Sequence, residues 1–173
     1  MVRHGESEAQ TKQLIGLNID ASLTEKGVAQ AMQLGTFYQQ TLRETGYYYV
    51  SSPAKRAVQT AELALEAAGI EAKRRALDPG LLEIFRGELD GTPFQGEVRA
   101  HWHKSYDSAE DLWEWSPCAE SETYGDMSRR VVPSFEKLVA EVPFGVNTEA
   151  TLWIFAHSVT IRSILWHCLG VGP

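Results

Sequence analysis

The chain has 173 residues, a formal net charge of −7 at pH 7, 43% hydrophobic residues and 23% charged residues. A chain of this length and composition has the size of one globular domain with one sizeable core. The acidic balance and the lack of a long Lys/Arg run argue against nucleic acid and anionic membrane surfaces as partners, because both require a broad basic face.

Two further features of the sequence concern location. No apolar run approaches the roughly 20 residues that span a membrane, and the first residues are charged, unlike those of a secretory signal. The two cysteines, Cys118 and Cys168, form no CxxC pair, which is typical of a reduced intracellular protein. We therefore expect a cytoplasmic protein, and an anionic small molecule remains possible as its ligand.

The first half of the chain contains two helical patterns around one apolar stretch. Small and apolar residues recur at helical spacing from Thr24 to about Gly46, and the aromatic run "YYYVSS" at 47–52 predicts a short buried strand. Pro53 after Ser52 then predicts a helix that Ser52 caps and that ends near Gly69.

The second half continues the alternation of strands and helices. A weaker strand at 72–77 leads to the glycine-bearing loop "LLEIFRGELDG" at 81–91, and the Trp-rich segment 101–121 has no clean periodicity. A helical face follows over 121–142, with Pro133 as an expected kink. "ATLWIFAH" at 150–157 predicts a strand buried on both sides, and "TIRSILWHCLG" at 160–170 predicts a closing helix.

This order predicts an α/β fold: a single three-layer domain over residues 1–173, in which a mainly parallel sheet is flanked by helices on both faces. Such sheets bind ligands at the carboxyl ends of their strands. Polar residues follow three of the expected strands at that edge: Arg3 and His4, Ser51 and Ser52, and His157 and Ser158.

Six blocks of the sequence occur in an order and spacing that belong to one known family. They are "VRHGES" at 2–7, "LTEKGVAQA" at 23–31, "SSPAKRAVQTAE" at 51–62, "LLEIFRGELDG" at 81–91, "ETYGDMSRRV" at 122–131 and "FAHSVTIR" at 155–162. The chain resembles the histidine phosphatase superfamily, in its phosphoglycerate-mutase-like branch, over essentially its whole length.

The resemblance implies roles for matching residues. His4 would be the nucleophile that carries the phosphoryl group as a covalent intermediate. Arg3, Arg56 and His157 would hold the phosphoryl oxygens, where charge develops as the ester bond breaks. Glu83 would protonate the leaving alkoxide and then activate water, which requires a carboxyl pKa raised towards neutrality. Neither a metal nor a cofactor is implied, because the arginines supply the positive charge.

Some positions depart from the family pattern. Gln10 stands where many relatives have an asparagine that touches the phosphate, and Ser158 and Val159 replace two glycines after the second histidine. Gln10 and Ser158 are therefore included as candidate phosphate-binding residues. Ile84 stands where mutases of the family have an arginine that grips the substrate carboxylate, which favours a phosphatase over a mutase.

The sequence thus predicts a metal-independent phosphomonoester hydrolase that acts through a phosphohistidine on a small phosphorylated metabolite. A cofactor-dependent phosphoglycerate mutase and a non-catalytic phosphate-binding module remain alternatives. The segment 92–121 is expected to be a cap insert that determines substrate specificity. The few residues before Arg3 suggest a longer parent polypeptide, and the oligomeric state is open.

One pair of histidines could chelate a metal in principle. His101 and His103 in "HWH" would point the same way in a strand, but no further His or Cys cluster accompanies them. The sequence therefore predicts a solvated or pocket-rim role for both, and no metal site.

Overall fold

A parallel sheet forms the middle layer of the molecule. The computed structural model describes residues 1–16, 20–44, 46–70, 75–142 and 150–171. Within these residues the four strands lie in the order β1-β4-β2-β3, and every neighbouring pair is parallel. The strands are β1 (Val2–Arg3), β2 (Gly46–Ser51), β3 (Arg75–Leu77) and β4 (Ala150–Ala156).

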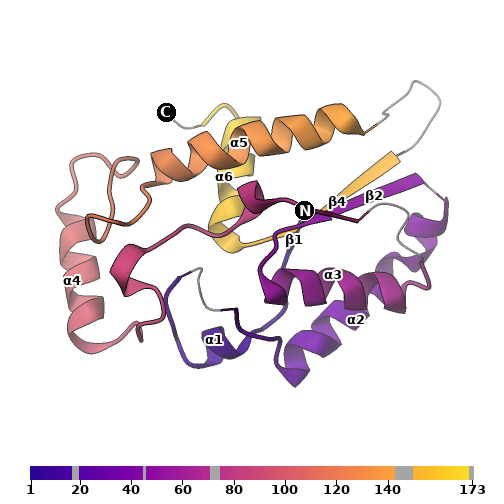
Figure 1. The fold of residues 1–173 in the computed structure, drawn as a ribbon, viewed down its shortest axis with the longest axis horizontal. Helices are drawn as coiled ribbons and strands as arrows, with labels where there is room; N and C mark the ends of the chain where they lie inside the picture. The colour runs from indigo at the N-terminus through magenta and orange to yellow at the C-terminus, as the bar shows by residue number, and fades with distance from the viewer. Residues whose placement is uncertain (17–19, 45, 71–74, 143–149, 172–173) are drawn as a thin grey trace.

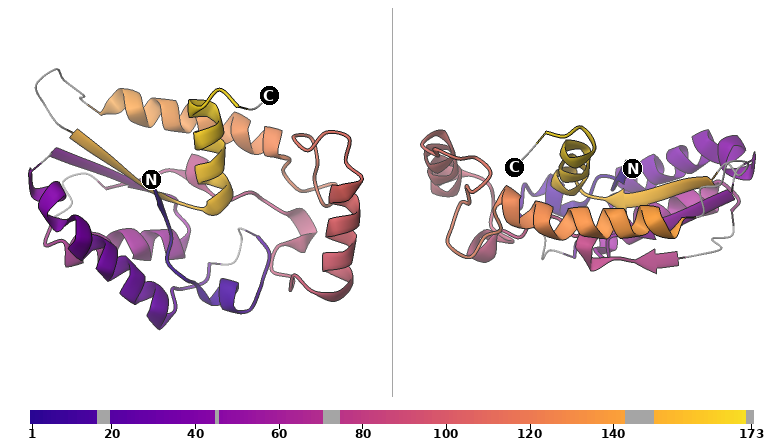
Figure 2. Two further views of the ribbon diagram at one scale, coloured as in Figure 1. Left: turned by 180° about the vertical axis from the view of Figure 1, so that it is seen from behind. Right: turned by 90° about the horizontal axis from the view of Figure 1, so that it is seen from above.

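Helices cover both faces of this sheet (Figure 1). One pair consists of α2 (Glu25–Glu44) and α3 (Lys55–Ala67), and the other of α5 (Tyr124–Glu141) and α6 (Ser158–Cys168). Two shorter helices, α1 (Glu8–Thr11) and α4 (Gly96–Asp107), and two 3₁₀ turns, Pro79–Leu81 and Gly87–Leu89, occupy the connections. In both views of Figure 2, α4 lies at the opposite end of the molecule from the N-terminal ends of β2 and β4. The predicted three-layer α/β fold is confirmed.

The strand sequences alternate between the two faces. Tyr49 and Phe155 pack with α3 and with Leu34 of α2 in one apolar cluster, whereas Val50 and Ile154 pack with α5 and α6 in the other. Successive side chains of a strand point to opposite faces, so each central strand supplies both layers of the core. This is why "ATLWIFAH" reads as continuously apolar, and the prediction that it is buried on both sides is confirmed for residues 153–156.

Most predicted elements are present, and three need correction or comment. The third helix begins at Lys55 with Ala54 at its N-cap, so the prediction that Ser52 caps it and Pro53 opens it is wrong. The segment 96–107, for which no helix was predicted, forms α4. The strand expected at 72–77 is β3, described from Arg75; residues 72–74 lie outside the described part.

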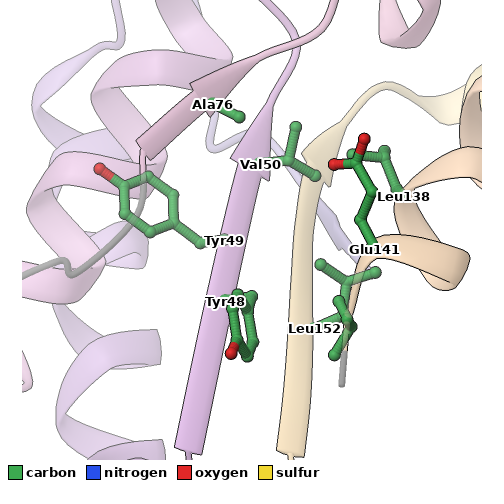
Figure 3. A pocket seen from close by; sticks show the side chains of 8 residues that line it. Tyr48, Tyr49, Val50, Ala76, Leu138, Glu141 and Leu152 are labelled. Carbon is green, nitrogen blue, oxygen red and sulfur yellow. The ribbon is translucent and has the colours of Figure 1, made fainter. Parts of the chain in front are cut away.

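Between the sheet and α5 lies a small cavity of about 30 Å³ (Figure 3). Its walls are mostly apolar, with Val50 and Leu152 from the sheet facing Leu138 of α5. A volume of this size holds about one water molecule. Since no candidate site residue lines it, we regard it as a packing gap. None of the described helices is both long and apolar enough to cross a bilayer.

Candidate functional site

The ends of three strands bring distant residues to one edge of the sheet. β1 and β2 flank β4, and Phe155 is the register partner of both Val2 and Ser51. The chain therefore leaves all three strands at the same level. The backbone N–H groups of His4 and Ser52 continue the ladder, donating to Ala156 O at 3.1 Å and to Phe155 O at 2.9 Å. His4, Ser52 and His157 meet at this edge.

The hydrogen bonds of His4 fix its tautomer. Its Nδ1 lies 2.7 Å from Gly5 O, a carbonyl that can only accept, so Nδ1 carries the proton. Its Nε2 accepts a hydrogen bond from Arg56 Nε at 3.1 Å and therefore presents a lone pair. The pKa of His4 is lowered to about 4, chiefly by burial, with the Arg56 and Arg3 charges acting in the same direction against the Gly5 hydrogen bond. The imidazole is neutral at pH 7.

His157 is fully buried beside His4, with 5.2 Å between the two ring centroids. Its Nε2 lies 2.8 Å from Ser52 Oγ, and its Nδ1 has no hydrogen-bond partner among the described residues. The pKa of His157 is lowered to about 2, first by burial and then by the neighbouring Arg56, His4, Arg3 and Arg130. This ring is also neutral at pH 7, so it can donate a hydrogen bond without adding charge.

Arg56 and Arg3 supply the positive charge of the site. Arg56 lies in the first turn of α3 with 4% of its surface exposed, and Thr60 in the next turn accepts from Gly5 N–H at 3.0 Å. Arg3 is exposed and lines two cavities with His4, of about 280 and 270 Å³. One guanidinium is thus fixed by the fold, and the other faces the solvent side of the site.

Glu83 contacts the first turn of α6. Its Oε2 accepts from Val159 N–H at 3.2 Å, and its Oε1 accepts from Ile84 N–H at 3.0 Å. The pKa of Arg56 is lowered, chiefly by burial, while the charge of Glu83 acts in the opposite direction. Glu83 and the Arg56 guanidinium therefore lie close enough to interact electrostatically. The Val159 position, where a glycine is usual, contributes its backbone to holding Glu83.

Gln10 and Ser158 also lie near the histidines. Gln10 lines the cavity of about 280 Å³ with Arg3 and His4, but its Oε1 accepts from Ser7 N–H at 3.1 Å and so supports the start of α1. Ser158 follows His157 directly as the first residue of α6. The structure brings all seven candidate residues to the same region.

A carboxylate–arginine pair, which the sequence analysis did not single out, holds the Glu83 segment. Arg130 binds Glu122 in a two-pronged pair, with Nε to Oε1 at 2.9 Å and Nη2 to Oε2 at 2.8 Å. Arg130 Nη1 also donates to Leu82 O at 3.2 Å, and Glu122 Oε2 accepts from Phe85 N–H at 2.9 Å. The pair therefore grips the backbone on both sides of Glu83. Glu122 precedes α5, and a spacing of eight residues is not one of the i,i+3 and i,i+4 intervals at which side chains of a helix pair, so the sequence held no local signal for this pair.

Two glycines allow the histidine loop to lie directly on α2. A Cβ atom on Gly5 would stand 2.6 Å from Gly27 O, and one on Gly27 would stand 2.0 Å from Glu6 O, distances that real Cβ atoms do not adopt. Glu6 itself accepts from Thr24 Oγ1 at 2.9 Å and pairs with Lys26 at 3.0 Å. Its contacts are those of a support for the loop.

His101 and His103 both lie on α4, two positions apart, so they do not face each other. The same-side alternation considered for a strand therefore does not apply to them. No three His, Cys, Asp or Glu side chains gather as metal ligands in the part of the chain that the structure describes.

The arrangement has a definite chemical capacity. A neutral imidazole presents a lone pair beside a buried guanidinium, a second neutral imidazole and a carboxylate. Such a group can attack an electrophile that carries negative charge on its oxygens, because the cation lies next to the nucleophile without protonating it.

Comparisons with known proteins point to one family. The sequence profile of the histidine phosphatase superfamily (branch 1) matches residues 1–173. A 2,3-bisphosphoglycerate-dependent phosphoglycerate mutase of Azorhizobium caulinodans is 31% identical over 172 residues, covering 95% of this chain and 78% of that protein.

Solved structures give the same family of folds. A protein described as mycobacterial hydrolase 1 superposes with a TM-score of 0.83 at 23% identity, covering 99% of this chain and 80% of that one. A mycobacterial glucosyl-3-phosphoglycerate phosphatase in complex with VO3 superposes with a TM-score of 0.75 at 25% identity, covering 99% and 81%.

Proposed function

The chain belongs to the histidine phosphatase superfamily, and we propose that it hydrolyses the phosphate monoester of a small metabolite, without a metal, through a phosphohistidine at His4. The observation that carries the proposal is the hydrogen bonding of His4. Gly5 O holds the proton on Nδ1, and the lone pair on Nε2 lies 3.1 Å from Arg56 Nε. A phosphate seated on Arg56 would meet that lone pair.

The proposed reaction has two steps. His4 Nε2 forms a bond to phosphorus while the bond from phosphorus to the ester oxygen breaks. Arg3, Arg56 and neutral His157 donate hydrogen bonds to the phosphoryl oxygens. Glu83 takes up a proton when the ester binds and gives it to the leaving alkoxide, and it then takes a proton from the water that attacks the phosphohistidine. Phosphate leaves, and His4 and Glu83 return to their starting states.

One residue favours hydrolysis over phosphoryl transfer to a second substrate. Ile84 occupies the position of the carboxylate-gripping arginine of the family's mutases, and with 3% of its surface exposed it packs in the core. The mycobacterial neighbour named as a phosphatase and bound to VO3 supports the same choice.

Cys118 and Cys168 are both free thiols, which supports a cytoplasmic location.

The test is hydrolysis of p-nitrophenyl phosphate by wild type and His4→Ala. We expect phosphate release in the presence of EDTA, its loss in the variant by a factor of at least about 10³, and an acid-labile phosphoenzyme in wild type only. Equal activity of the two proteins would refute the proposal. Binding of vanadate without turnover or a trapped phosphoenzyme would instead indicate a non-catalytic phosphate-binding module.

A phosphoglycerate mutase is the second candidate, favoured by the 31% identity to the Azorhizobium enzyme of that name. It predicts interconversion of 3-phosphoglycerate and 2-phosphoglycerate that requires priming by 2,3-bisphosphoglycerate. Measuring isomerisation and phosphate release in the same reaction separates the two activities. Isomerisation faster than release would favour the mutase.

A further inference from the structure

A larger cavity lies beside the region where His4 lines two smaller ones. Its volume is about 550 Å³, within the range of roughly 300–1,000 Å³ that is typical of ligand pockets. It lies between the segment 13–15 and the region of α4, and its walls are mainly apolar: Leu14, Ile15, Phe94 and Trp102, with Gln13 and Arg99.

The aromatic wall is braced from behind. The Phe94 and Trp102 rings meet edge to face with 5.5 Å between their centroids, and Trp102 meets Trp115 in the same way at 5.2 Å. The Arg86 guanidinium, 4% exposed, lies 5.0 Å from the centre of the Trp102 ring. Such contacts hold the rings in place before any ligand binds.

The cavity lies next to the His4 site along the chain and in space. Gln13 N–H donates to Gln10 O at 3.0 Å, and Gln10 and Thr11 line the cavity that contains His4. The Cα atoms of Thr11 and Gln13 can be no more than about 7 Å apart. Phe94 N–H donates to Gln13 O at 2.8 Å, so the wall is tied to this same short segment.

Among the described residues that line the cavity, few are polar. Arg99 is the charged one of this set, and it contacts His103 Nε2 at 3.5 Å. The acidic residues Asp107, Glu110 and Asp111 of the same insert are exposed and do not line the cavity. The cavity therefore suits an apolar group, with a cation at its edge.

We propose that this cavity binds the alcohol portion of the substrate, and that the substrate class is the phosphate monoester of a bulky apolar alcohol, aryl or branched alkyl. The inference rests on the proposed function, because it takes the phosphate to lie at His4. It gives the insert 92–121 a definite role: Phe94 and Trp102 select the leaving group by size and apolar contact.

The kinetic test compares two esters whose alcohols have similar acidity, 3-phenylpropyl phosphate and n-propyl phosphate. We expect kcat/KM for the phenyl ester to be at least about tenfold higher, since apolar groups added in a fitting pocket have effects of this size or more. Trp102→Ala should reduce that ratio about tenfold. Trp113→Ala is the matched control, because it removes a tryptophan of the same insert that does not line the cavity.

Loss of Trp102 can also loosen α4, so a second variant changes the cavity without removing a stacked ring. Ile15→Asp places a carboxylate in the apolar wall and should lower the ratio by a similar factor. Its fold is checked by circular dichroism and by hydrolysis of n-propyl phosphate. A ratio near one in wild type, or a ratio unchanged in both variants, would overturn the proposal.

A binding measurement separates this inference from the hydrolase proposal. Isothermal titration with 4-phenylbutylphosphonate and butylphosphonate, in which a methylene replaces the ester oxygen of the two substrates and which cannot be hydrolysed, needs no turnover. We expect the phenyl compound to bind wild type about tenfold more tightly, with the preference lost in Ile15→Asp. If neither ester is hydrolysed but this preference is observed, hydrolysis fails and the cavity assignment stands. Equal affinities would reject the cavity assignment whatever the esters do.

Discussion

The His157 ring is oriented by a hydroxyl group: Ser52 Oγ lies 2.8 Å from its Nε2. The sequence placed Ser52 at the correct edge of the sheet but gave it the wrong task, because a serine followed by proline is also the usual start of a helix. A cap and a ring-positioning contact use the same hydroxyl. Only the contact between Ser52 and His157, 105 positions later, shows which of these two roles the hydroxyl has.

Replacing Ser52 tests this contact. Ser52→Ala removes a hydrogen bond of about 1 kcal/mol, so we expect kcat to fall about fivefold to tenfold as His157 loses its orientation. Ser51→Ala is the matched control, since Ser51 Oγ donates to Ser52 O at 2.8 Å and does not contact His157. Steady-state kinetics and thermal unfolding of both variants check the prediction. An equal fall of kcat in both would show that the effect is structural.

Among the elements, α5 contributes to the site through Arg130, whose side chain donates hydrogen bonds to the backbone oxygens of Gly80 and Leu82, just before Glu83. Sequence periodicity correctly predicted α5 as a helix, and Val131, Phe135 and Leu138 of its expected apolar face pack against the sheet, whereas Val139 is exposed. It could not give the polar pair, because Glu122 lies before the helix and the partners of Arg130 at 80–83 are about 50 residues earlier. A long-range pair of this kind has no local signature.

Arg130→Met should affect reactions that need a proton from Glu83. We expect a fall in kcat of about tenfold or more for alkyl phosphates and a smaller fall for p-nitrophenyl phosphate, whose leaving group needs no protonation. Glu122 would be left half-buried without its partner, so the free energy of unfolding should also fall, by about 1–3 kcal/mol.

The control for this variant is Arg129→Met on the same helix. Arg129 forms an exposed pair with Asp126 at 2.8 Å, and exposed pairs contribute within about 1 kcal/mol. Its kinetics with both esters should match wild type. A uniform loss with both esters in Arg130→Met would argue against a positioning role for Arg130.

The start of α2 depends on the close approach between Gly27 and the histidine loop. Gly27→Ala should gain up to about 1 kcal/mol in helix propensity, but the new Cβ would meet Glu6 O, and overpacking of this kind costs about 1–3 kcal/mol. We expect net destabilisation and a fall in kcat, because the displaced backbone adjoins His4. Urea unfolding measures the first effect. Gln33→Ala, exposed on the same helix, should change stability by less than about 0.5 kcal/mol.

The sequence did not predict α4, and the reason is physical. Its apolar residues do not form a stripe at helical spacing, and none of its residues is fully buried. What it buries is held by aromatic contacts of Trp102 with Phe94 and Trp115, which lie outside the helix. Elements stabilised by a few distant rings leave little periodic signal.

For the whole molecule, the two buried neutral histidines predict acid sensitivity. The pKa of His157 is about 2 in the folded protein against 6.5 for the ordinary side chain, so between these pH values the unfolded chain binds the extra proton. Stability is therefore full above about pH 6.5 and falls as the pH decreases, by up to about 1.4 kcal/mol per pH unit for one proton. His4 acts in the same direction down to about pH 4.

Urea unfolding at pH 7.5, 6.5 and 5.5 measures this slope. His157→Gln should show a shallower dependence on pH than wild type over the same interval, whatever its absolute stability. His101→Gln, at an exposed histidine of α4, should keep the wild-type slope. A slope unchanged in His157→Gln would mean that this ring is not held neutral by burial.

At this scale the sequence predicted well. The alternation of strands and helices fixed the architecture, and the rule that ligands bind at the carboxyl ends of parallel strands selected the edge where Arg3, His4, Ser52 and His157 meet. The strand-end rule predicted where the site lies. It could not predict the individual contacts, such as Arg56 with His4 or Ser52 with His157, because these join residues far apart in the sequence.

The order β1-β4-β2-β3 has a consequence for how the protein is made. Of the four described strands, β4 comes last in sequence, and it lies between β1, which precedes His4, and β2, which precedes Ser52; neither β1 nor β2 pairs with the other. A nascent chain emerging from the ribosome has no continuous sheet at this edge until residues 150–156 are free. The candidate site therefore cannot assemble without β4, and chains truncated before residue 150 should be inert towards phosphate esters.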